Sequence, residues 1–155
     1  MSLEQDIRRL ARTPLLGAVT ADALRLIAFS AEPVELAPGD VLFRRGDAAD
    51  CAYFIVSGAI GFHDDDQPYD DPPRHRAGSD SMIGETAMIA EVERPATARA
   101  LEPTLALRIP RTIMKRVLIE FPEDAARMRA RLARQLVAFG EELAHARSRS
   151  IEPGE

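Results

Sequence analysis

The sequence predicts an α+β fold that is mainly β, with helices at both ends of the chain and a β-sandwich or barrel between them. The central part, Val34 to Ile109, consists of short apolar runs separated by glycine, proline and aspartate, which is typical of closely spaced strands. On either side, apolar residues recur every three or four positions, as in amphipathic helices. A chain of 155 residues that is 46% hydrophobic suits one domain with one sizeable core, so residues 1–155 are expected to form a single domain.

The N-terminal region, residues 1–31, is expected to form two helices. Leu3, Ile7 and Leu10 share one face of the first helix. Thr20 is the expected N-cap of the second helix, because its side-chain oxygen can accept a hydrogen bond from the first turn.

The central region, residues 33–109, is expected to be built of strands and tight turns. "CAYFIV", residues 51–56, is a continuous apolar run of strand length, and "TLALRI", residues 104–109, is the expected last strand. Turns that need a positive φ angle are expected at three glycines: Gly39, Gly46 and Gly58.

An aspartate-rich segment, residues 64–76, interrupts the central region. It contains three prolines and five aspartates, so it cannot be an interior strand. Its aspartates with His63 and His75 would be the ligands of a metal site, but the spaced ligands, glycine and closing glutamate of a calcium loop are missing. A solvated hairpin loop is therefore favoured over a metal site.

The C-terminal region, residues 111–148, returns to helix. One amphipathic segment precedes Pro122, which opens a longer helix at a position where proline is tolerated. The apolar residues of the long helix are spaced as in a coiled-coil seam, which predicts a homodimer through this helix. These residues are Ala125, Met128, Leu132, Leu136, Phe139, Leu143 and Ala146.

Charge and composition exclude several classes of protein. The net charge of −5 argues against a broad nucleic-acid footprint. The single cysteine, Cys51, forms no intrachain disulfide framework and favours a reducing cytoplasm. The first residues contain no long apolar stretch, so neither a signal peptide nor contact with a membrane is expected. The lone cysteine and scattered histidines form no nucleophile pattern, so no enzyme activity is expected.

"IGETAMIAEVERPATA", residues 83–98, is the stretch that carries chemistry. If Gly84 ends a strand and a short helix follows from about Thr86, the amides of Thr86, Ala87 and Met88 point outward and attract an anion. Glu85 is suited to accept hydrogen bonds from sugar hydroxyls, and Arg94 to neutralise the anion with directional donors. Together these groups predict a site for a sugar phosphate or nucleotide.

With these residues the chain resembles the cyclic nucleotide-binding domain family, which includes the catabolite activator protein and the regulatory subunits of protein kinase A. The resemblance covers nearly the whole chain, and residues 83–98 resemble the family's phosphate-binding cassette, with matching spacing from Gly84 to Arg94. It implies an eight-stranded double-stranded β-helix, also called a jelly-roll or β-roll, flanked by N-terminal helices and by C-terminal helices that include one long helix.

The resemblance also implies roles for single residues. Glu85 would accept from the ribose 2′-hydroxyl, Arg94 would pair with the cyclic phosphate, and backbone amides near Ala87 would complete the contact. A residue of the C-terminal helix would cover the base. The expected ligand-binding residues are Gly84, Glu85, Thr86, Ala87, Arg94, Pro95 and Ala96, and the base-capping candidates are Gln135, Leu136 and Phe139; packing in a core or dimer seam is the alternative role for the last three.

Pro95 departs from the family's pattern. The family usually has alanine, serine or threonine after the arginine, whose N–H helps to bind the phosphate, and proline has no N–H. A hydrogen bond to a charged group contributes roughly 1.5–3 kcal/mol, so its loss weakens binding by about one to two orders of magnitude. Proline also lacks the hydroxyl that often accompanies guanine preference, which favours cyclic AMP over cyclic GMP.

The sequence therefore predicts a cytoplasmic, non-catalytic regulatory domain that senses a cyclic nucleotide, needs no cofactor or metal, and signals to an unknown downstream protein. One alternative is a degenerate cassette, in which Glu85 and Arg94 form a structural ion pair and the fold serves dimerisation or protein interaction. Another is the sensor fragment of a larger Crp/Fnr-like regulator. No helix-turn-helix domain and no direct DNA binding are expected, because "SRSIEPGE", which follows the long helix, is too short for one.

Overall fold

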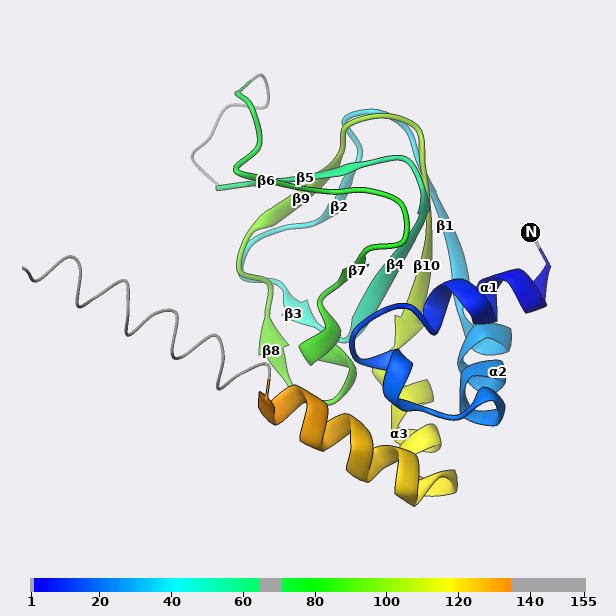
Figure 1. The fold of residues 1–155 in the computed structure, drawn as a ribbon. Coiled ribbons are helices and arrows are strands. Elements are labelled where there is room, and N and C mark those ends of the chain that lie inside the picture. The colour runs from blue at the N-terminus through cyan, green and yellow to red at the C-terminus, as the bar shows by residue number, and fades with distance from the viewer. Residues whose placement is uncertain (1, 65–70, 135–155) are drawn as a thin grey trace, which may run out of the picture.

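The computed structural model describes residues 2–64 and 71–134 of the chain. A roll of β-strands occupies one side of the molecule and the helices gather at the other (Figure 1). The helices are α1 (Leu3–Leu10), η1 (Leu16–Ala18), α2 (Ala21–Ser30), η2 (Glu85–Met88) and α3 (Arg111–Glu120). A further helix starts at residue 122 and is described as far as residue 134. The prediction of a mainly β fold with flanking helices is confirmed.

The described residues contain ten strands rather than the eight expected from the resemblance. The strands are β1 (Glu32–Leu36), β2 (Val41–Phe43), β3 (Ala48–Ala49), β4 (Cys51–Ser57), β5 (Ile60–His63), β6 (His75–Ala77), β7 (Met82–Ile83), β8 (Val92–Glu93), β9 (Thr97–Ala100) and β10 (Thr104–Pro110). The difference is small, because β3, β7 and β8 are two-residue pieces beside turns.

Two four-stranded sheets and one short ribbon form the roll. The first sheet has the order β1-β10-β4-β7, the second β2-β9-β5-β6, and β3 pairs with β8. Every pairing is antiparallel. Pro33 lies in β1, an edge strand of the first sheet, where proline is tolerated because its missing N–H costs no ladder bond.

β4 faces two cores at once, which explains why "CAYFIV" is apolar throughout. Successive side chains of a strand point to opposite faces. Cys51, Tyr53 and Ile55 belong to the core inside the roll. The residues between them, including Phe54, belong to a second core under the helices.

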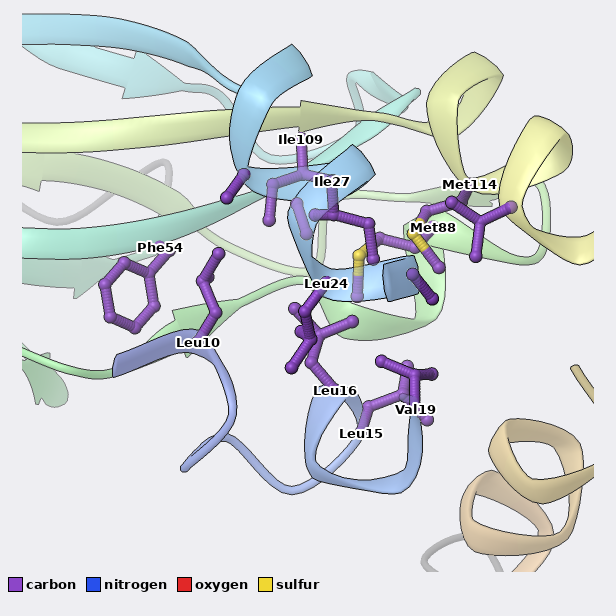
Figure 2. Packing of buried hydrophobic residues seen from close by; sticks show 14 of the residues in the cluster. Leu10, Leu15, Leu16, Val19, Leu24, Ile27, Phe54, Met88, Ile109 and Met114 are labelled. Carbon is purple, nitrogen blue, oxygen red and sulfur yellow. The ribbon is translucent and has the colours of Figure 1, made fainter. Parts of the chain in front are cut away.

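The second core joins the helices to the outer face of the first sheet (Figure 2). Leu10 of α1, Ile27 of α2 and Met114 of α3 are fully buried there. Met88, the last residue of η2, is also fully buried in this core. The short helix of the 83–98 segment is therefore anchored in the helical layer.

Polar groups dock the C-terminal helix onto the N-terminal helices. Asp124, which is 2% exposed, accepts hydrogen bonds from the Thr20 N–H at 3.2 Å and from its hydroxyl at 2.7 Å. Arg127 pairs with Asp124 and donates to the Ala18 carbonyl at 2.9 Å. Thr20 is the N-cap residue of α2, as expected, but its hydroxyl donates to Asp124 instead of capping the helix.

Three residues of the expected dimer seam pack inside the chain instead, and Ala125, the first of them, is 1% exposed. Met128 is fully buried in the core under the helices, and Leu132 packs against it. Gln135, Leu136, Phe139, Leu143 and Ala146 lie outside the described residues. The described part of the helix therefore packs within this chain, and the homodimer stays a prediction.

The aspartate-rich segment connects β5 and β6, which pair as an antiparallel hairpin with β6 at the sheet edge. Residues 65–70 are outside the described part. His63 is buried and His75 is exposed. Across residues 2–64 and 71–134, no three metal-ligating side chains gather. Among the helices in these ranges, none combines the length and apolar character that crossing a membrane requires.

Candidate functional site: the pocket between Gly84 and Arg94

Gly84 makes the turn that opens the site. It is the N-cap of η2 and has φ 74° and ψ 38°, a left-handed conformation that glycine adopts without strain. η2 begins at Glu85, slightly earlier than expected, and is a 3₁₀ helix. The Ala87 N–H, which was expected to face an anion, donates to the Gly84 carbonyl at 2.9 Å. The first backbone N–H groups of a short helix have no hydrogen-bond acceptor within the helix. In η2 these are the N–H groups of Glu85 and Thr86.

The backbone of Arg94 is fixed by the turn that precedes β3. Its N–H donates to the Asp47 carbonyl at 2.8 Å, and its carbonyl accepts from the Gly46 N–H at 2.8 Å. From this position the side chain runs back to Gly84. A Cβ atom on Gly84 would lie 2.5 Å from Nη1 of Arg94, so the site requires glycine for space as well as for its backbone conformation.

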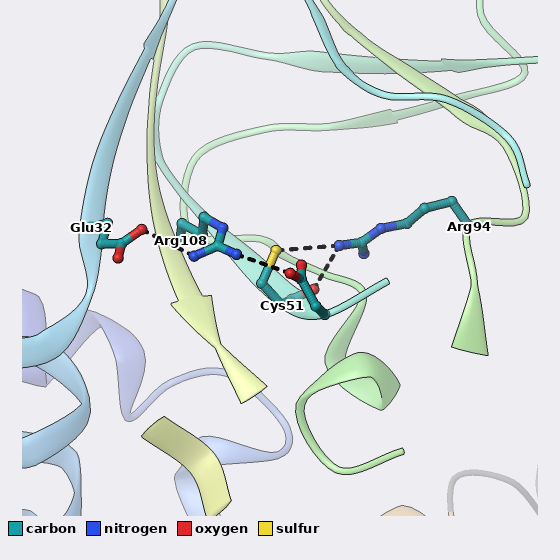
Figure 3. A network of polar contacts seen from close by, with 5 residues as sticks. Glu32, Cys51, Arg94 and Arg108 are labelled. Carbon is teal, nitrogen blue, oxygen red and sulfur yellow. Dashed lines mark hydrogen bonds and ion pairs between the residues drawn. The ribbon is translucent and has the colours of Figure 1, made fainter. Parts of the chain in front are cut away.

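The Arg94 guanidinium is buried without a carboxylate. The residue is 5% exposed, and Nη2 donates to the Cys51 carbonyl at 2.7 Å and to its Sγ at 3.4 Å (Figure 3). Its Cζ atom lies 4.3 Å from the ring centroid of Phe43 and 5.6 Å from that of Tyr53. Within the described residues, no ion pair joins Arg94 to Glu85 or to any other carboxylate.

A pocket of about 270 Å³ lies beside this guanidinium. It is lined by Ala49, Gly84, Thr86, Ala87, Val92, Glu93, Arg94 and Pro95. Small-molecule sites start at roughly 300 Å³, so the pocket is just below the usual range. Five of the expected ligand-binding residues line it, while Glu85 and Ala96 are half-buried neighbours of lining residues.

Glu85 is the titratable group of the cassette with an altered pKa. Burial raises the pKa of its carboxyl above the ordinary value of 4.5, because a low-dielectric surrounding disfavours the charged form. A ligand that donates hydrogen bonds to the carboxylate would favour that charged form. Glu85 is therefore suited to meet hydroxyl donors rather than the anion itself.

Three contacts of Arg94 were missed by the sequence reasoning: Phe43, Cys51 and Tyr53. Cys51 and Tyr53 are two positions apart on β4 and share its inward face. The strand pattern of "CAYFIV" could therefore have indicated both residues. Phe43 comes from β2 in the other sheet, and no local pattern brings it to β4. The base-capping candidates Gln135, Leu136 and Phe139 lie outside the described residues.

Other hollows in the described part suit an anion less well. The hollow of about 320 Å³ beside Thr20 is lined by the acidic residues Glu120, Glu123 and Asp124. A hollow of about 540 Å³ at the opposite end of β4 carries Glu35 and Asp40.

A basic hollow of about 360 Å³ lies over α1 and is lined by Gln5, Arg8, Arg9 and Arg12. Arg9 already pairs with Asp80 at 2.6 Å. Only the pocket at Gly84 combines a buried cation with the start of a helix among these hollows.

Comparison with known families gives one match over the β-roll. The model of the family described as cyclic nucleotide-binding domain matches residues 33–121. Among curated proteins, the chain is 30% identical over 118 residues to a putative potassium channel protein of Rhodopseudomonas palustris and 27% identical over 113 residues to a lysophospholipase of Neurospora crassa. These alignments cover 76% and 73% of this chain but only 28% and 8% of the relatives.

Solved structures show the same fold. A cyclic nucleotide-binding-like protein of Brucella abortus is 41% identical, with a TM-score of 0.67, covering 74% of this chain and 97% of that one. The N-terminal domain of a transcriptional regulator of Streptomyces coelicolor is 27% identical, with a TM-score of 0.75 and coverage of 87% and 94%. The regulatory domain of Toxoplasma gondii protein kinase A, crystallised with cyclic AMP, is 20% identical, with a TM-score of 0.65 and coverage of 74% and 44%. At this identity the similarity supports the fold alone.

Proposed function

Since the chain belongs to the cyclic nucleotide-binding domain family, we propose that the pocket between Gly84 and Arg94 binds a cyclic nucleotide, with cyclic AMP favoured. The domain senses this ligand without catalysis and passes the signal to a downstream protein. One observation carries the proposal: Arg94 is a buried cation that has no carboxylate partner in the described residues.

A buried charge without a counter-ion is costly, because the protein interior solvates it poorly. The carbonyl and sulfur of Cys51 and two aromatic rings offset part of this cost at Arg94 but do not neutralise it. The monoanionic phosphate of a cyclic nucleotide would supply the missing charge and form charge-assisted hydrogen bonds. Thr86, in the first turn of η2, lines the same pocket, and the backbone amide of such a position favours the same anion.

Glu85 and Pro95 bear on which nucleotide is bound. Glu85 is half-buried next to the pocket residues Gly84 and Thr86, and its carboxyl would accept hydrogen bonds from ribose hydroxyls. Pro95 lines the pocket but offers neither an N–H nor a hydroxyl, which favours adenine over guanine and a weakened affinity. A base lid from Gln135, Leu136 or Phe139 remains part of the proposal.

A nucleotide-independent interaction module is the second candidate. It is favoured by the modest volume of the pocket and by Glu93, whose exposed carboxylate lines it and opposes an anion. The degenerate cassette with a Glu85–Arg94 ion pair is not supported, since that pair is absent from the described residues. We also propose that the protein is cytoplasmic and forms a homodimer through its C-terminal helix. It acts either as an independent domain or as the sensor part of a larger Crp/Fnr-like regulator.

Calorimetric titration with cyclic AMP and cyclic GMP tests the proposal. We expect cyclic AMP to bind more tightly. Arg94→Ala should weaken binding by about 2–5 kcal/mol, because it removes the charged partner of the phosphate. Arg76→Ala is the matched control, since Arg76 is an exposed arginine of edge strand β6 and should not affect affinity. Equal cyclic AMP affinity in the parent and in Arg94→Ala would contradict the proposed function.

A further inference from the structure

Two neighbouring aromatic rings from different sheets contact the Arg94 guanidinium. Phe43 ends β2 in the second sheet, and Tyr53 lies inside β4 in the first. Their ring centroids are 6.1 Å apart with an interplanar angle of 29°. The Arg94 Cζ atom is within 6 Å of both centroids, at 4.3 Å from Phe43 and 5.6 Å from Tyr53. At these distances a cation is attracted to a ring face.

Cys51 fixes the remaining side of the guanidinium. Nη2 of Arg94 donates to the Cys51 carbonyl at 2.7 Å, which is a short bond to a backbone atom that cannot rotate away. Cys51 and Tyr53 are two positions apart on β4 and point into the same core. The strand therefore presents a ring and a carbonyl to the same group.

Two carboxylates, those of Glu32 and Asp50, pair with another arginine. Arg108 on β10 pairs with Glu32 at 3.0 Å (Figure 3). It also pairs with Asp50 at 3.3 Å. Asp50 directly precedes β4 and pairs with Arg108 rather than with Arg94.

The contacts with Cys51, Phe43 and Tyr53 thus hold Arg94 in place without neutralising its charge. The carboxylate of Glu93, which lines the same pocket, is exposed and forms no ion pair with Arg94 in the described residues.

The fixed guanidinium directs one nitrogen to the turn at Gly84. Nη1 lies 2.5 Å from the place where a Cβ atom of Gly84 would be, and both residues line the pocket. We infer that Phe43, Tyr53 and the Cys51 carbonyl form a positioning clamp that presents Nη1 of Arg94 to an anion bound at the Gly84 turn. The identity of that anion rests on the proposed function, whereas the clamp itself does not.

The two rings contribute unequally to the clamp. Phe43 is nearer to the charge than Tyr53, so truncation of Phe43 should free the guanidinium more. Tyr53 acts through its ring, so Tyr53→Phe should preserve the clamp and Tyr53→Leu should weaken it. Phe54 offers a matched control: it is fully buried on the opposite face of β4, where it contacts Arg9 rather than Arg94.

The first test needs no ligand. Urea unfolding of the full chain is measured for Phe43→Leu, Arg94→Met and the double variant. The clamp predicts that the effects of the two substitutions are not additive, because each removes the same contact. Phe54→Leu combined with Arg94→Met should be additive. Additive effects for Phe43→Leu and Arg94→Met would overturn the clamp.

The second test measures cyclic AMP affinity by calorimetry. Phe43→Leu should weaken binding about tenfold, since a displaced guanidinium loses a contact of that size. Phe54→Leu should stay within about twofold of the parent. Unchanged affinity in Phe43→Leu, or an equal loss in Phe54→Leu, would overturn the positioning role. A parent chain that binds no cyclic AMP would overturn the proposed function, and the unfolding cycle would still decide whether the clamp exists.

Discussion

Pro95 lines the pocket directly after Arg94 and gives the ligand no N–H. Proline also restricts the residue before it to extended geometry, which is a second way to aim Arg94. In the structure, this restriction by proline is not needed to hold the Arg94 backbone in place. The Arg94 backbone is already held by two 2.8 Å hydrogen bonds to Asp47 and Gly46. The missing donor is therefore the main consequence of proline at this position.

Pro95→Ala should consequently tighten cyclic AMP binding, by up to roughly tenfold, because it restores a backbone N–H next to the phosphate. Calorimetric titration of the variant and the parent under identical salt conditions measures the change. Pro33→Ala is the control, because Pro33 is an exposed residue of edge strand β1, which contributes no residue to the pocket. Weaker binding in Pro95→Ala would mean that proline itself aims the arginine.

At the scale of the elements, the C-terminal helix is held to the N-terminal helices by Asp124. Its carboxylate accepts two hydrogen bonds from Thr20 and pairs with Arg127, and it is almost fully buried. Arg131 adds a hydrogen bond of 2.7 Å to the Pro14 carbonyl. Any movement of this helix on ligand binding must break these contacts or carry the N-terminal helices with it.

Asp124→Ala should lower the free energy of unfolding by about 1–3 kcal/mol, because it leaves the polar groups of Thr20 without a buried partner. Chemical denaturation measures the loss. Glu123→Ala is the matched control: Glu123 is the exposed neighbour, and its substitution should change stability by less than about 0.5 kcal/mol. A loss in Asp124→Ala no greater than in Glu123→Ala would show that the docking contact does not stabilise the fold.

The same elements show what the sequence could predict and what it could not. Local signals sufficed for the strand over "CAYFIV", for the turn at Gly84 and for the return of Arg94 to that turn. The hydrogen bond between Thr20 and Asp124 joins residues 104 positions apart, and Phe43 reaches Arg94 across two sheets. Such contacts depend on tertiary packing, which periodicity and turn chemistry do not encode. Met128 packs in the core under the helices rather than in a dimer seam, and this too depends on tertiary packing.

At the scale of the whole molecule, Glu85 links ligand binding to global stability. Burial raises the pKa of its carboxyl in the folded chain above the ordinary value of 4.5. The folded state therefore holds this proton more tightly than the unfolded state does. As pH rises through 4.5 and then through the raised pKa, the folded state loses stability relative to the unfolded state. At neutral pH the free chain carries a destabilising carboxylate beside its pocket.

Glu85→Gln should for this reason be more stable than the parent at pH 7 without ligand, and the difference should vanish below pH 4.5, where the parent carboxyl is protonated in both states. Denaturation midpoints on both sides of that pH measure the effect.

The same variant should bind cyclic AMP more weakly, because the ribose hydroxyls lose a charged acceptor. Glu91→Gln, an exposed glutamate of the same segment, should change neither property. A Glu85→Gln variant that is less stable than the parent at pH 7 would show that the carboxylate is satisfied within the free protein, and a gain in stability without loss of affinity would separate Glu85 from the ligand.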